Sequence, residues 1–274
     1  MRNNCWGRSH NKIINLAIAV TMTACNAKSV TTPQLNSNST QKIPQVVAEP
    51  THHSKTAIKN LNFSVPVKFQ GKIVYKVKVP PEEKVIALTI DDGPWKPTTT
   101  QMLDILKQNN VKATFFWLGK TVQTYPQIAK RVIAEGHAIG NHTWNHRYQR
   151  VTPAVAKDEI ERTAKIIYQT TGVKTSLFRP PGGYLNNGLA AYAKSQKYSV
   201  LMWSQTSADT DPRAKYQVFV KNVLRDAQPG GIVLMHDGGG DRSRTVKALP
   251  EMIKGLKQKG YRFVTIPELL QMSP

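Results

Sequence analysis

The sequence predicts an α/β domain built around a parallel sheet, and two features of the chain support this fold class. From Lys84 onward, strand-like and helix-like runs alternate about seven times. The first strand-like run, 85–90, is continuously apolar, as is typical of a parallel strand that is buried on both faces. The alternation fits either a sheet closed into a barrel or an open, doubly wound sheet. At 274 residues, the chain is long enough for one large core of this kind.

Each expected strand is a short apolar run bounded by turn residues. These strands are 85–90, 113–118, 138–140, 177–179, 200–203, 232–236 and 263–265. The runs between them have helical periodicity. They predict helices near 97–109, 121–135, 153–171, 187–196, 213–227 and 244–258, with a short last helix near 267–272. Upstream, 63–69 and 72–79 alternate polar and apolar residues around Gln70-Gly71, which predicts a short β-hairpin over 61–83 before a main domain at 84–272.

Residues 1–24 have the pattern of a targeting segment. Its start is basic, with Arg2, Arg8 and Lys12. The apolar run 13–24 is shorter than the roughly 20 residues that a bilayer span needs. It ends at Met22-Thr23-Ala24-Cys25, which resembles a bacterial lipobox with Met in place of the commoner Leu, and this implies cleavage before Cys25 and acylation of its thiol. A plain secretory signal and an uncleaved anchor are the alternatives. Residues 25–60, rich in Thr, Ser, Asn, Gln and Pro, predict a disordered linker.

The remaining global features are cysteine content and charge. The other cysteine, Cys5, lies inside the targeting segment, so the mature domain would have no disulfide. The formal net charge is +21, and removal of the three basic residues of the targeting segment leaves +18. This surplus favours anionic surroundings such as wall polymers or acidic lipid heads, although it is also compatible with a merely solubilising surface. Nucleic acid is not expected as a partner, because the basic residues are spread along the chain without a recognition motif.

The run 85–90 ends in two adjacent carboxylates, Asp91 and Asp92, followed by the chain-breaking pair Gly93-Pro94. α/β folds place their chemistry at the carboxyl ends of parallel strands. Neighbouring residues of an extended chain point to opposite sides, so one Asp could bind a cation while the other stays free as a base. Taken alone, the pair would more often cap a turn and the helix that follows.

Two histidines, His142 and His146, are four residues apart, a spacing that places both imidazoles on the same face of a helical turn. Taken alone, such a pair is more often incidental. Together with Asp92 it offers two nitrogens and one oxygen, which suits zinc or a similar divalent ion with positions left open. This pattern is typical of a catalytic rather than a structural site. His137, beside the expected strand 138–140, is interpreted as structural.

Two further residues stand at the ends of expected strands. Arg179 begins a rigid Arg-Pro-Pro segment, and an Arg there can pair with a carboxylate and lower its pKa. His236 closes the strand 232–236 and is a candidate proton donor on the rim that carries the carboxylates. Each has a plainer interpretation by itself, as a surface Arg in a turn and as a structural His.

Taken together and in order, these stretches resemble the polysaccharide deacetylases of the NodB-homology type, carbohydrate esterase family 4, over about 84–270. The resemblance implies a distorted (β/α)7–8 barrel of the NodB type. It also implies a role for each matching residue: Asp91 as the base, Asp92, His142 and His146 as metal ligands, Arg179 as the residue that orients the base, Leu234 as part of the acetyl-methyl pocket, and His236 as the general acid.

The chain departs from the family pattern at two places. Gly182 stands where the family usually has an aromatic residue after Arg-Pro-Pro; its backbone N–H can still hold the oxyanion, but one groove wall is lost. The fourth motif, usually Asp-x-x-Asp-Trp, appears as Thr206-Ser-Ala-Asp209-Thr210. Asp209 is retained and is expected to belong to the catalytic group, whereas the first Asp and the Trp are replaced by Thr.

The function expected from these features is metal-dependent hydrolysis of N-acetyl groups on an amino-sugar glycan, either peptidoglycan or a chitin-like polymer, with release of acetate. The expected cofactor is a divalent metal, first of all zinc, with cobalt, nickel or manganese as alternatives. An O-acetyl esterase and a non-catalytic wall-binding lipoprotein are the competing hypotheses. We expect an exported monomer that faces the periplasm or cell wall and is anchored to the membrane through Cys25.

Overall fold

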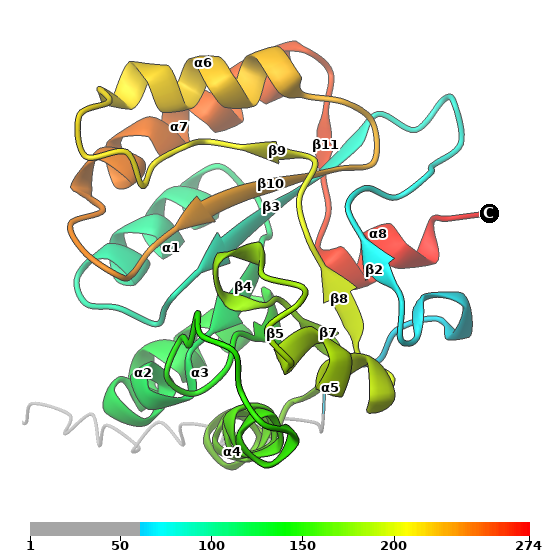
Figure 1. Ribbon diagram of the computed structural model, residues 1–274. Coiled ribbons are helices and arrows are strands. Elements are labelled where there is room, and N and C mark those ends of the chain that lie inside the picture. The colour runs from blue at the N-terminus through cyan, green and yellow to red at the C-terminus, as the bar shows by residue number, and fades with distance from the viewer. Residues whose placement is uncertain (1–60) are drawn as a thin grey trace, which may run out of the picture. The chain divides into compact units, whose positions relative to one another are not determined.

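The computed structural model describes residues 61–274, which form a curled, all-parallel sheet surrounded by helices (Figure 1). The order of its strands is β2-β8-β7-β5-β4-β3-β10-β9, and β11 pairs alongside β3. A separate two-stranded sheet joins β1 and β6. Within the described residues, the end strands β2 and β9 each have a single partner, so the sheet curls into part of a barrel without closing. The predicted α/β class and distorted barrel are thereby confirmed.

The strands are short except for the neighbouring pair β3 and β10. They are β1 (Asn62–Phe63), β2 (Ile73–Val74), β3 (Val85–Asp91), β4 (Thr114–Trp117), β5 (Ala138–Asn141), β6 (Lys174–Thr175), β7 (Leu177–Phe178), β8 (Ser199–Leu201), β9 (Gln205–Thr206), β10 (Gly231–His236) and β11 (Arg262–Phe263). Every residue of β3 is buried, which is why its sequence is mostly apolar and does not alternate between apolar and polar residues.

The helices lie close to the expected ranges. They are α1 (Thr98–Gln108), α2 (Gly119–Thr124), α3 (Pro126–Ala134), α4 (Pro153–Thr171), α5 (Leu189–Ser195), α6 (Tyr216–Asp226), α7 (Ser243–Gln258) and α8 (Ile266–Gln271), with two 3-10 turns, η1 (Val67–Phe69) and η2 (Pro181–Gly183). The single helix expected over 121–135 is divided, because Pro126 begins a new helix and cannot continue the old one.

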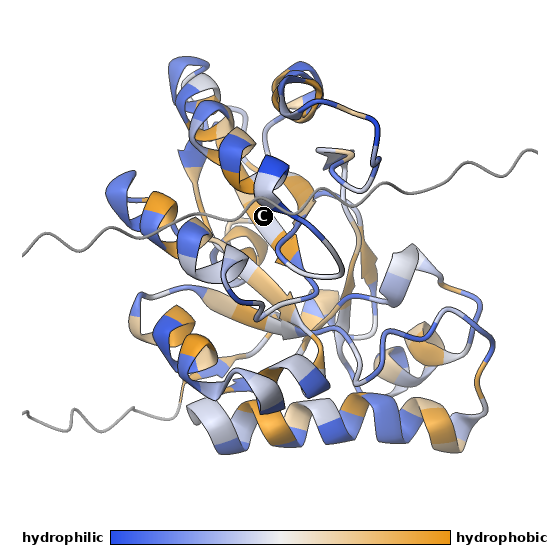
Figure 2. Ribbon diagram, turned by 90° about the vertical axis from the view of Figure 1, so that its left-hand side faces the viewer, coloured by the Kyte–Doolittle hydropathy of each residue, from blue (hydrophilic) through white to orange (hydrophobic). Residues whose placement is uncertain are grey.

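The helices pack on the sheet through their apolar faces. Helices α6 and α7 lie side by side next to β9 and β10, whereas α2, α3 and α4 group near β4 and β5 (Figure 1). In Figure 2 the helices carry hydrophobic and hydrophilic residues on different sides, as helices that cover a sheet do. The largest core cluster joins side chains of β3, β4 and β10 to side chains of α1, α3, α6 and α7.

The prediction of a β-hairpin over 61–83 is wrong. Strand β1 pairs with β6 and strand β2 pairs with β8, both in parallel, and the two strands do not pair with each other. Val74 and Val77 are buried in a core cluster of the main domain, so this segment is part of that domain rather than an extension of it. An isolated two-stranded hairpin is marginally stable. Strand β2 instead gains hydrogen bonds and apolar packing at the open edge of the large sheet, beside β8, and β1 finds a partner in β6 of the same domain.

The predicted targeting segment 1–24, the lipobox cysteine Cys25 and the linker 25–60 lie outside the described residues. In residues 61–274, no helix combines the length and the apolar character that crossing a membrane requires.

Candidate active site

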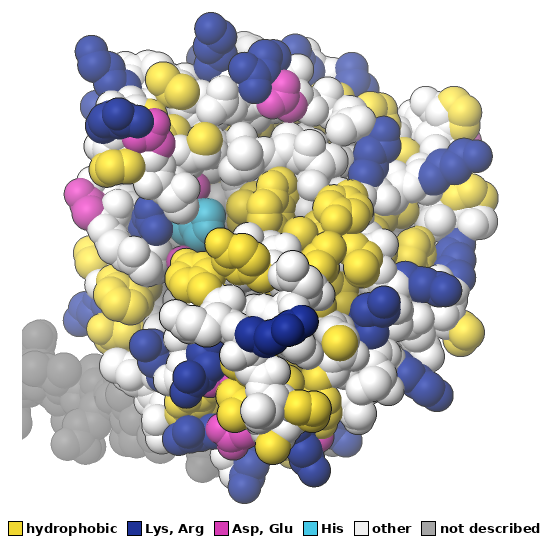
Figure 3. Space-filling view, viewed as in Figure 1, with side chains coloured by type: hydrophobic (Ala, Val, Ile, Leu, Met, Phe, Trp, Pro, Cys, Tyr) yellow, Lys and Arg dark blue, Asp and Glu magenta, His cyan; other side chains and the backbone are white. Residues whose placement is uncertain are grey.

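The carboxyl ends of the central strands open into a cavity of about 670 Å3. Figure 3 shows a histidine in this hollow, hydrophobic side chains beside it, and Lys and Arg side chains spread around the periphery. Seven of the predicted site residues line the cavity: Asp91, Asp92, His142, His146, Gly182, Leu234 and His236. The other two, Arg179 and Asp209, are buried and hydrogen-bonded to lining residues. His137 lies outside this group and accepts a hydrogen bond at Nδ1 from the backbone N–H of Ala113.

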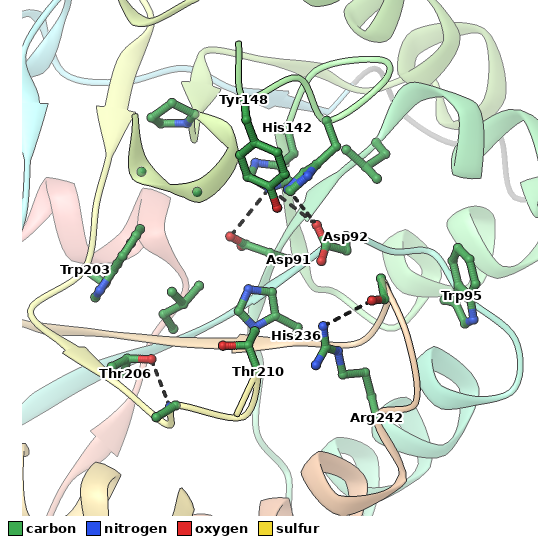
Figure 4. Close-up of a pocket in the computed structure, with 18 of the residues that line it drawn as sticks. Asp91, Asp92, Trp95, His142, Tyr148, Trp203, Thr206, Thr210, His236 and Arg242 are labelled. Carbon is green, nitrogen blue, oxygen red and sulfur yellow. Dashed lines mark hydrogen bonds and ion pairs between the residues drawn. The ribbon is translucent and has the colours of Figure 1, made fainter. Parts of the chain in front are cut away.

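Asp92, His142 and His146 form a compact cluster in the cavity, and Figure 4 shows Asp92 and His142 facing each other. One ligand atom of each residue lies within 4.8 Å of the other two. Oδ1 of Asp92 is 3.5 Å from Nε2 of His142 and 3.2 Å from Nε2 of His146. This oxygen is buried and has no hydrogen-bond partner among residues 61–274. A buried carboxylate oxygen left unpaired beside two imidazole nitrogens fits a bound cation.

The protonation of His142 also suits a metal ligand. Its Nδ1 donates a 2.7 Å hydrogen bond to the backbone carbonyl of Arg179, so in the neutral ring the lone pair belongs to Nε2, on the side of Asp92. Burial lowers the pKa of His142 to about 3, and the ring is therefore neutral at ordinary pH. Zinc and similar divalent ions accept this donor set with positions left open.

The two histidines lie on an irregular loop, and the predicted helical turn is wrong. Residues 142–146 contain no helix, and Thr143 and His146 have left-handed φ angles of 72° and 58°. The ring centroids of the two histidines are nevertheless 5.0 Å apart. The rings therefore meet because of this loop conformation and not because of helical periodicity.

Glu159, on α4, holds this loop in place. Its buried carboxylate accepts hydrogen bonds from the backbone N–H groups of Trp144 (2.9 Å) and Asn145 (2.7 Å), from the amide of Asn145 (2.8 Å) and from Nε of Arg147 (2.8 Å). Burial by itself would raise the pKa of Glu159, but these hydrogen bonds hold it below its usual value. Sequence reasoning missed this residue. The available signal was an acidic side chain within the apolar stripe of the predicted helix 153–171.

Asp91, the last residue of β3, pairs with Arg179, which follows β7. Nη1 of Arg179 donates to Oδ1 of Asp91 and to the hydroxyl of Thr89, both at 2.8 Å. The rest of the guanidinium donates to the carbonyl oxygens of Leu201 (2.9 Å) and Met202 (3.0 Å). The expected pairing is present, but the expected net effect on the pKa is not. Burial raises the pKa of Asp91 above its usual value, although Arg179 acts to lower it.

His236, at the end of β10, pairs with the carboxylate of Asp209. Nδ1 of His236 lies 2.9 Å from Oδ1 of Asp209, and the backbone N–H of His236 donates to Oδ2 at 2.9 Å. Thr245 donates a further hydrogen bond to Oδ2. Burial acts to lower the pKa of His236, but the hydrogen bond and charge of Asp209, with the charges of Asp91 and Asp92, raise it overall. The imidazole can therefore hold a proton at higher pH than an ordinary histidine.

Gly93 is required by packing against Asp237, the residue after His236. A Cβ at Gly93 would lie 2.3 Å from Oδ2 of Asp237, closer than real atoms approach. Asp237 is fully buried and accepts a hydrogen bond from the hydroxyl of Thr99. Burial raises the pKa of Asp237 to about 7. The glycine after the two carboxylates therefore makes room for a third one behind the site.

The positions at which the chain departs from the family pattern also lie at the cavity. Gly182 is in η2 with a left-handed φ of 60°, and Leu234 of β10 lines the cavity wall. Thr206 and Thr210 both face the cavity (Figure 4), and the hydroxyl of Thr206 accepts a hydrogen bond from the backbone N–H of Ala208. Short hydroxyl side chains therefore stand where the family pattern has an acidic and an aromatic residue.

One rim of the curled sheet carries three groups of side chains: an Asp–His–His cluster, a buried Asp–Arg pair and an Asp–His pair. This combination is typical of the active site of a metal-dependent hydrolase.

The chain belongs to the polysaccharide deacetylase family. The family model, polysaccharide deacetylase, matches residues 78–201. A peptidoglycan-N-acetylglucosamine deacetylase of Bacillus cereus is 43% identical over 198 residues, which cover 71% of this chain and 92% of that protein. The peptidoglycan-N-acetylmuramic acid deacetylase PdaC of Bacillus subtilis is 38% identical over 70% of this chain and 40% of its own length.

Solved structures share the fold. A peptidoglycan N-acetylglucosamine deacetylase in complex with an N-hydroxybenzamide has a TM-score of 0.68 at 37% identity, covering 76% of this chain and 96% of that one. A pseudoenzyme of carbohydrate esterase family 4 from Bacillus anthracis has a TM-score of 0.67 at 31% identity, covering 74% and 70% of the two chains. Since a named enzyme and a named pseudoenzyme match almost equally well, the fold alone does not decide activity, and the side chains of the site must.

Proposed function

We propose that this protein is a metal-dependent deacetylase that hydrolyses the N-acetyl groups of amino sugars in peptidoglycan. One observation carries the proposal: the Asp92–His142–His146 cluster lies in the same cavity as the Asp91–Arg179 and Asp209–His236 pairs. A non-catalytic protein would have no need to keep the metal cluster and both of these pairs. The choice of peptidoglycan is supported by the relatives, which are deacetylases of its N-acetylglucosamine or N-acetylmuramic acid units.

Zinc is the cation that we propose for the Asp92, His142 and His146 cluster. Two imidazole nitrogens and one carboxylate oxygen form a donor set that zinc favours, and three protein ligands leave positions for water and substrate. A cation held there would supply Lewis acidity toward the acetyl carbonyl and toward water. The carbonyl of Arg179 keeps the Nε2 lone pair of His142 available, and Glu159 keeps the loop of both histidines in position.

The other site residues activate the water, stabilise the oxyanion and contact the acetyl methyl group. Asp91, oriented by Arg179, takes a proton from the attacking water, and the raised pKa of Asp91 makes it a stronger base than an ordinary carboxylate. The backbone N–H of Gly182 donates to the oxygen that becomes negative, a contact that is typically worth about 10²–10³ in rate. Leu234 offers an apolar surface to the acetyl methyl group.

His236, held by Asp209, gives its proton to the departing nitrogen, because an amine anion is too basic to leave near neutral pH. The carbon–nitrogen bond of the acetamide breaks, the water oxygen remains on the carbonyl carbon, and the products are acetate and a free amino sugar. The raised pKa of His236 lets the imidazole keep this proton to higher pH than an ordinary histidine does.

The test is acetate release by the full-length protein with added zinc. The substrates are purified peptidoglycan, tetra-N-acetylchitotetraose and acetylated xylan. We expect acetate from the first two. Asp91→Asn is the matched control, because it removes the base while leaving the three metal ligands unchanged, and it should abolish acetate release but retain zinc. If the unaltered protein binds peptidoglycan but releases no acetate with zinc, cobalt, nickel or manganese, the hypothesis of a non-catalytic wall-binding lipoprotein is correct.

An O-acetyl esterase is the second candidate, and one comparison favours it. A bifunctional xylanase/deacetylase of Pseudobutyrivibrio xylanivorans is 38% identical over 192 residues. An alkoxide leaves more readily than an amine anion, so an enzyme for esters depends less on its proton donor. His236→Ala should therefore reduce amide hydrolysis more than ester hydrolysis. A higher rate on acetylated xylan than on tetra-N-acetylchitotetraose would identify the esterase.

We propose that the protein is exported, that it faces the periplasm or cell wall as a monomer, and that a lipid on Cys25 anchors it to the membrane. The basic start, the short apolar run and the lipobox-like end of 1–24 support export. Membrane fractionation of cells that express the protein or Cys25→Ala tests the anchor. We expect the variant to leave the membrane fraction, and an unchanged distribution would contradict the lipid anchor.

A further inference from the structure

Two half-exposed tyrosines, one of which lines the cavity, pack against each other. Tyr148 follows the histidine loop and is 51% exposed, and Tyr184 follows η2 and is 48% exposed. Their ring centroids are 5.8 Å apart with an interplanar angle of 82°, an edge-to-face arrangement. Tyr148 lines the cavity itself. We call Tyr148 and Tyr184 together the tyrosine shelf.

The shelf lies directly beside the proposed metal ligands. The Tyr148 ring meets the His146 ring edge to face, with centroids 4.9 Å apart. In Figure 4 the hydroxyl of Tyr148 points toward Asp91 and Asp92 in the cavity. A molecule whose acetyl group reaches the metal cluster would therefore pass over the shelf.

The shelf exists because residue 182 has no side chain. A Cβ at Gly182 would lie 2.8 Å from Cε1 of Tyr148 and 2.9 Å from Cε2 of Tyr184, closer than real atoms approach. A side chain at position 182 would therefore require both tyrosine rings to move from their present positions. The left-handed φ of 60° at Gly182 favours glycine there as well. The rings of Tyr148 and Tyr184 therefore lie where a side chain of residue 182 would otherwise lie.

The contacts that the two shelf tyrosines make within residues 61–274 do not explain them as residues that stabilise the fold. Neither shelf hydroxyl makes a hydrogen bond to another described residue, whereas the hydroxyl of Tyr192 donates to Glu161. About half of each shelf side chain faces solvent, so the rings contribute little buried area to the core. Tyrosine combines a rigid apolar face with a polar hydroxyl and is favoured at binding surfaces for that reason.

We propose that the tyrosine shelf is a sugar subsite, on which the apolar face of a pyranose ring stacks. The inference rests on the proposed function, because it requires a glycan substrate. The sugar on the shelf is the neighbour, along the glycan, of the unit whose acetamide reaches the Asp92–His142–His146 cluster, since the Tyr148 ring lies beside that cluster and not within it. The C–H groups on one face of the ring pack against the Tyr148 ring, and hydroxyl groups at the edge of the sugar can bond the phenol.

The test measures glycan binding without turnover, in the full-length, zinc-loaded Asp91→Asn protein. Isothermal titration calorimetry gives the Kd for tetra-N-acetylchitotetraose and for the monosaccharide N-acetylglucosamine. Adding Tyr148→Ala should weaken tetrasaccharide binding about tenfold, equivalent to about 1.4 kcal/mol. Tyr148→Phe, which keeps the ring, should stay within about threefold. Tyr184→Ala should weaken binding about threefold, because it removes the edge-to-face support of Tyr148.

Zinc affinity separates the subsite from a structural role. If Tyr148 only supports His146, Tyr148→Ala will weaken zinc binding, and the loss of tetrasaccharide binding will follow from it; that result overturns the proposal. Unchanged zinc affinity with weaker tetrasaccharide binding supports it. Monosaccharide binding should change less than tetrasaccharide binding, and an equal loss for both would overturn the assignment to a neighbouring sugar.

The failure of this inference can be told apart from the failure of the proposed function. If the Asp91→Asn protein binds tetrasaccharide and the Tyr148→Ala and Tyr184→Ala variants bind it equally well, the shelf is not a subsite and the deacetylase proposal stands. If the Asp91→Asn protein binds none of the glycan and the unaltered protein releases no acetate, both proposals are wrong.

Discussion

Nδ1 of His142 lies 2.7 Å from the backbone carbonyl oxygen of Arg179, whose side chain pairs with Asp91. One residue therefore serves two parts of the site through different atoms. Its carbonyl fixes the tautomer of a proposed metal ligand, and its guanidinium orients the proposed base. A substitution at position 179 changes the side chain and leaves the carbonyl, so the two contributions can be separated by experiment.

Arg179→Met should destabilise the fold by about 3–5 kcal/mol, because it leaves the buried carboxylate of Asp91 without its partner. Urea unfolding measures this change. Zinc affinity should fall much less than acetate release, since the carbonyl that holds His142 remains. Arg225→Met is the control. Arg225 pairs with Asp226 on the surface, and its loss should cost less than about 0.5 kcal/mol. Equal costs for the two variants would contradict the buried-pair argument.

Glu159→Gln should weaken zinc binding about 10–100-fold, the usual cost of losing a partner that orients metal ligands. The amide keeps the shape of the side chain but loses its charge, and so weakens the bonds that hold Trp144, Asn145 and Arg147. Competition with a chelator measures the affinity. Glu161→Gln on the same helix is the matched control, since Glu161 contacts Tyr192 and not the histidine loop. An affinity equal to that of the control would show that the loop does not depend on Glu159.

Asp209→Asn should move the alkaline limb of the kcat/KM profile to lower pH. Asp209 raises the pKa of His236, and the proton donor must be protonated to act. Removing the carboxylate charge lowers that pKa, so the active form is lost at a lower pH. Thr245→Val removes a hydrogen bond to Asp209 and keeps the charge, so it should move the limb less. An unmoved limb in Asp209→Asn would mean that another group controls it.

Gly93→Ala should destabilise the fold by about 1–3 kcal/mol, because the added methyl group would overlap the carboxylate of Asp237. Gly93 lies outside the left-handed region, so the cost is one of packing and not of backbone conformation. In a double-mutant cycle measured by urea unfolding, Asp237→Ala should relieve part of the cost, with a coupling of at least about 0.5 kcal/mol. Additive effects would contradict direct contact between these two positions.

Several features could be predicted from the sequence because they depend on neighbouring residues. The predicted helix 153–171 has the same bounds as α4, since Thr152 caps it, Pro153 begins it and Gly172 ends it with a φ of 72°. The continuous apolar run of β3 could be recognised in the same way. Because all the strands are parallel, residues at their carboxyl ends share one rim. This is how Asp91 and His236 become cross-strand neighbours across 145 positions.

The amino-acid order by itself determined the β/α alternation and the placement of the chemistry-bearing residues at strand ends, since both follow from local patterns. Only the tertiary structure decided that β1 and β2 pair with different strands, that Glu159 holds the histidine loop, and that two tyrosines occupy the space beside Gly182. These features arise where segments far apart in the chain compete for the same hydrogen bonds and the same volume, and that competition is settled by packing in three dimensions.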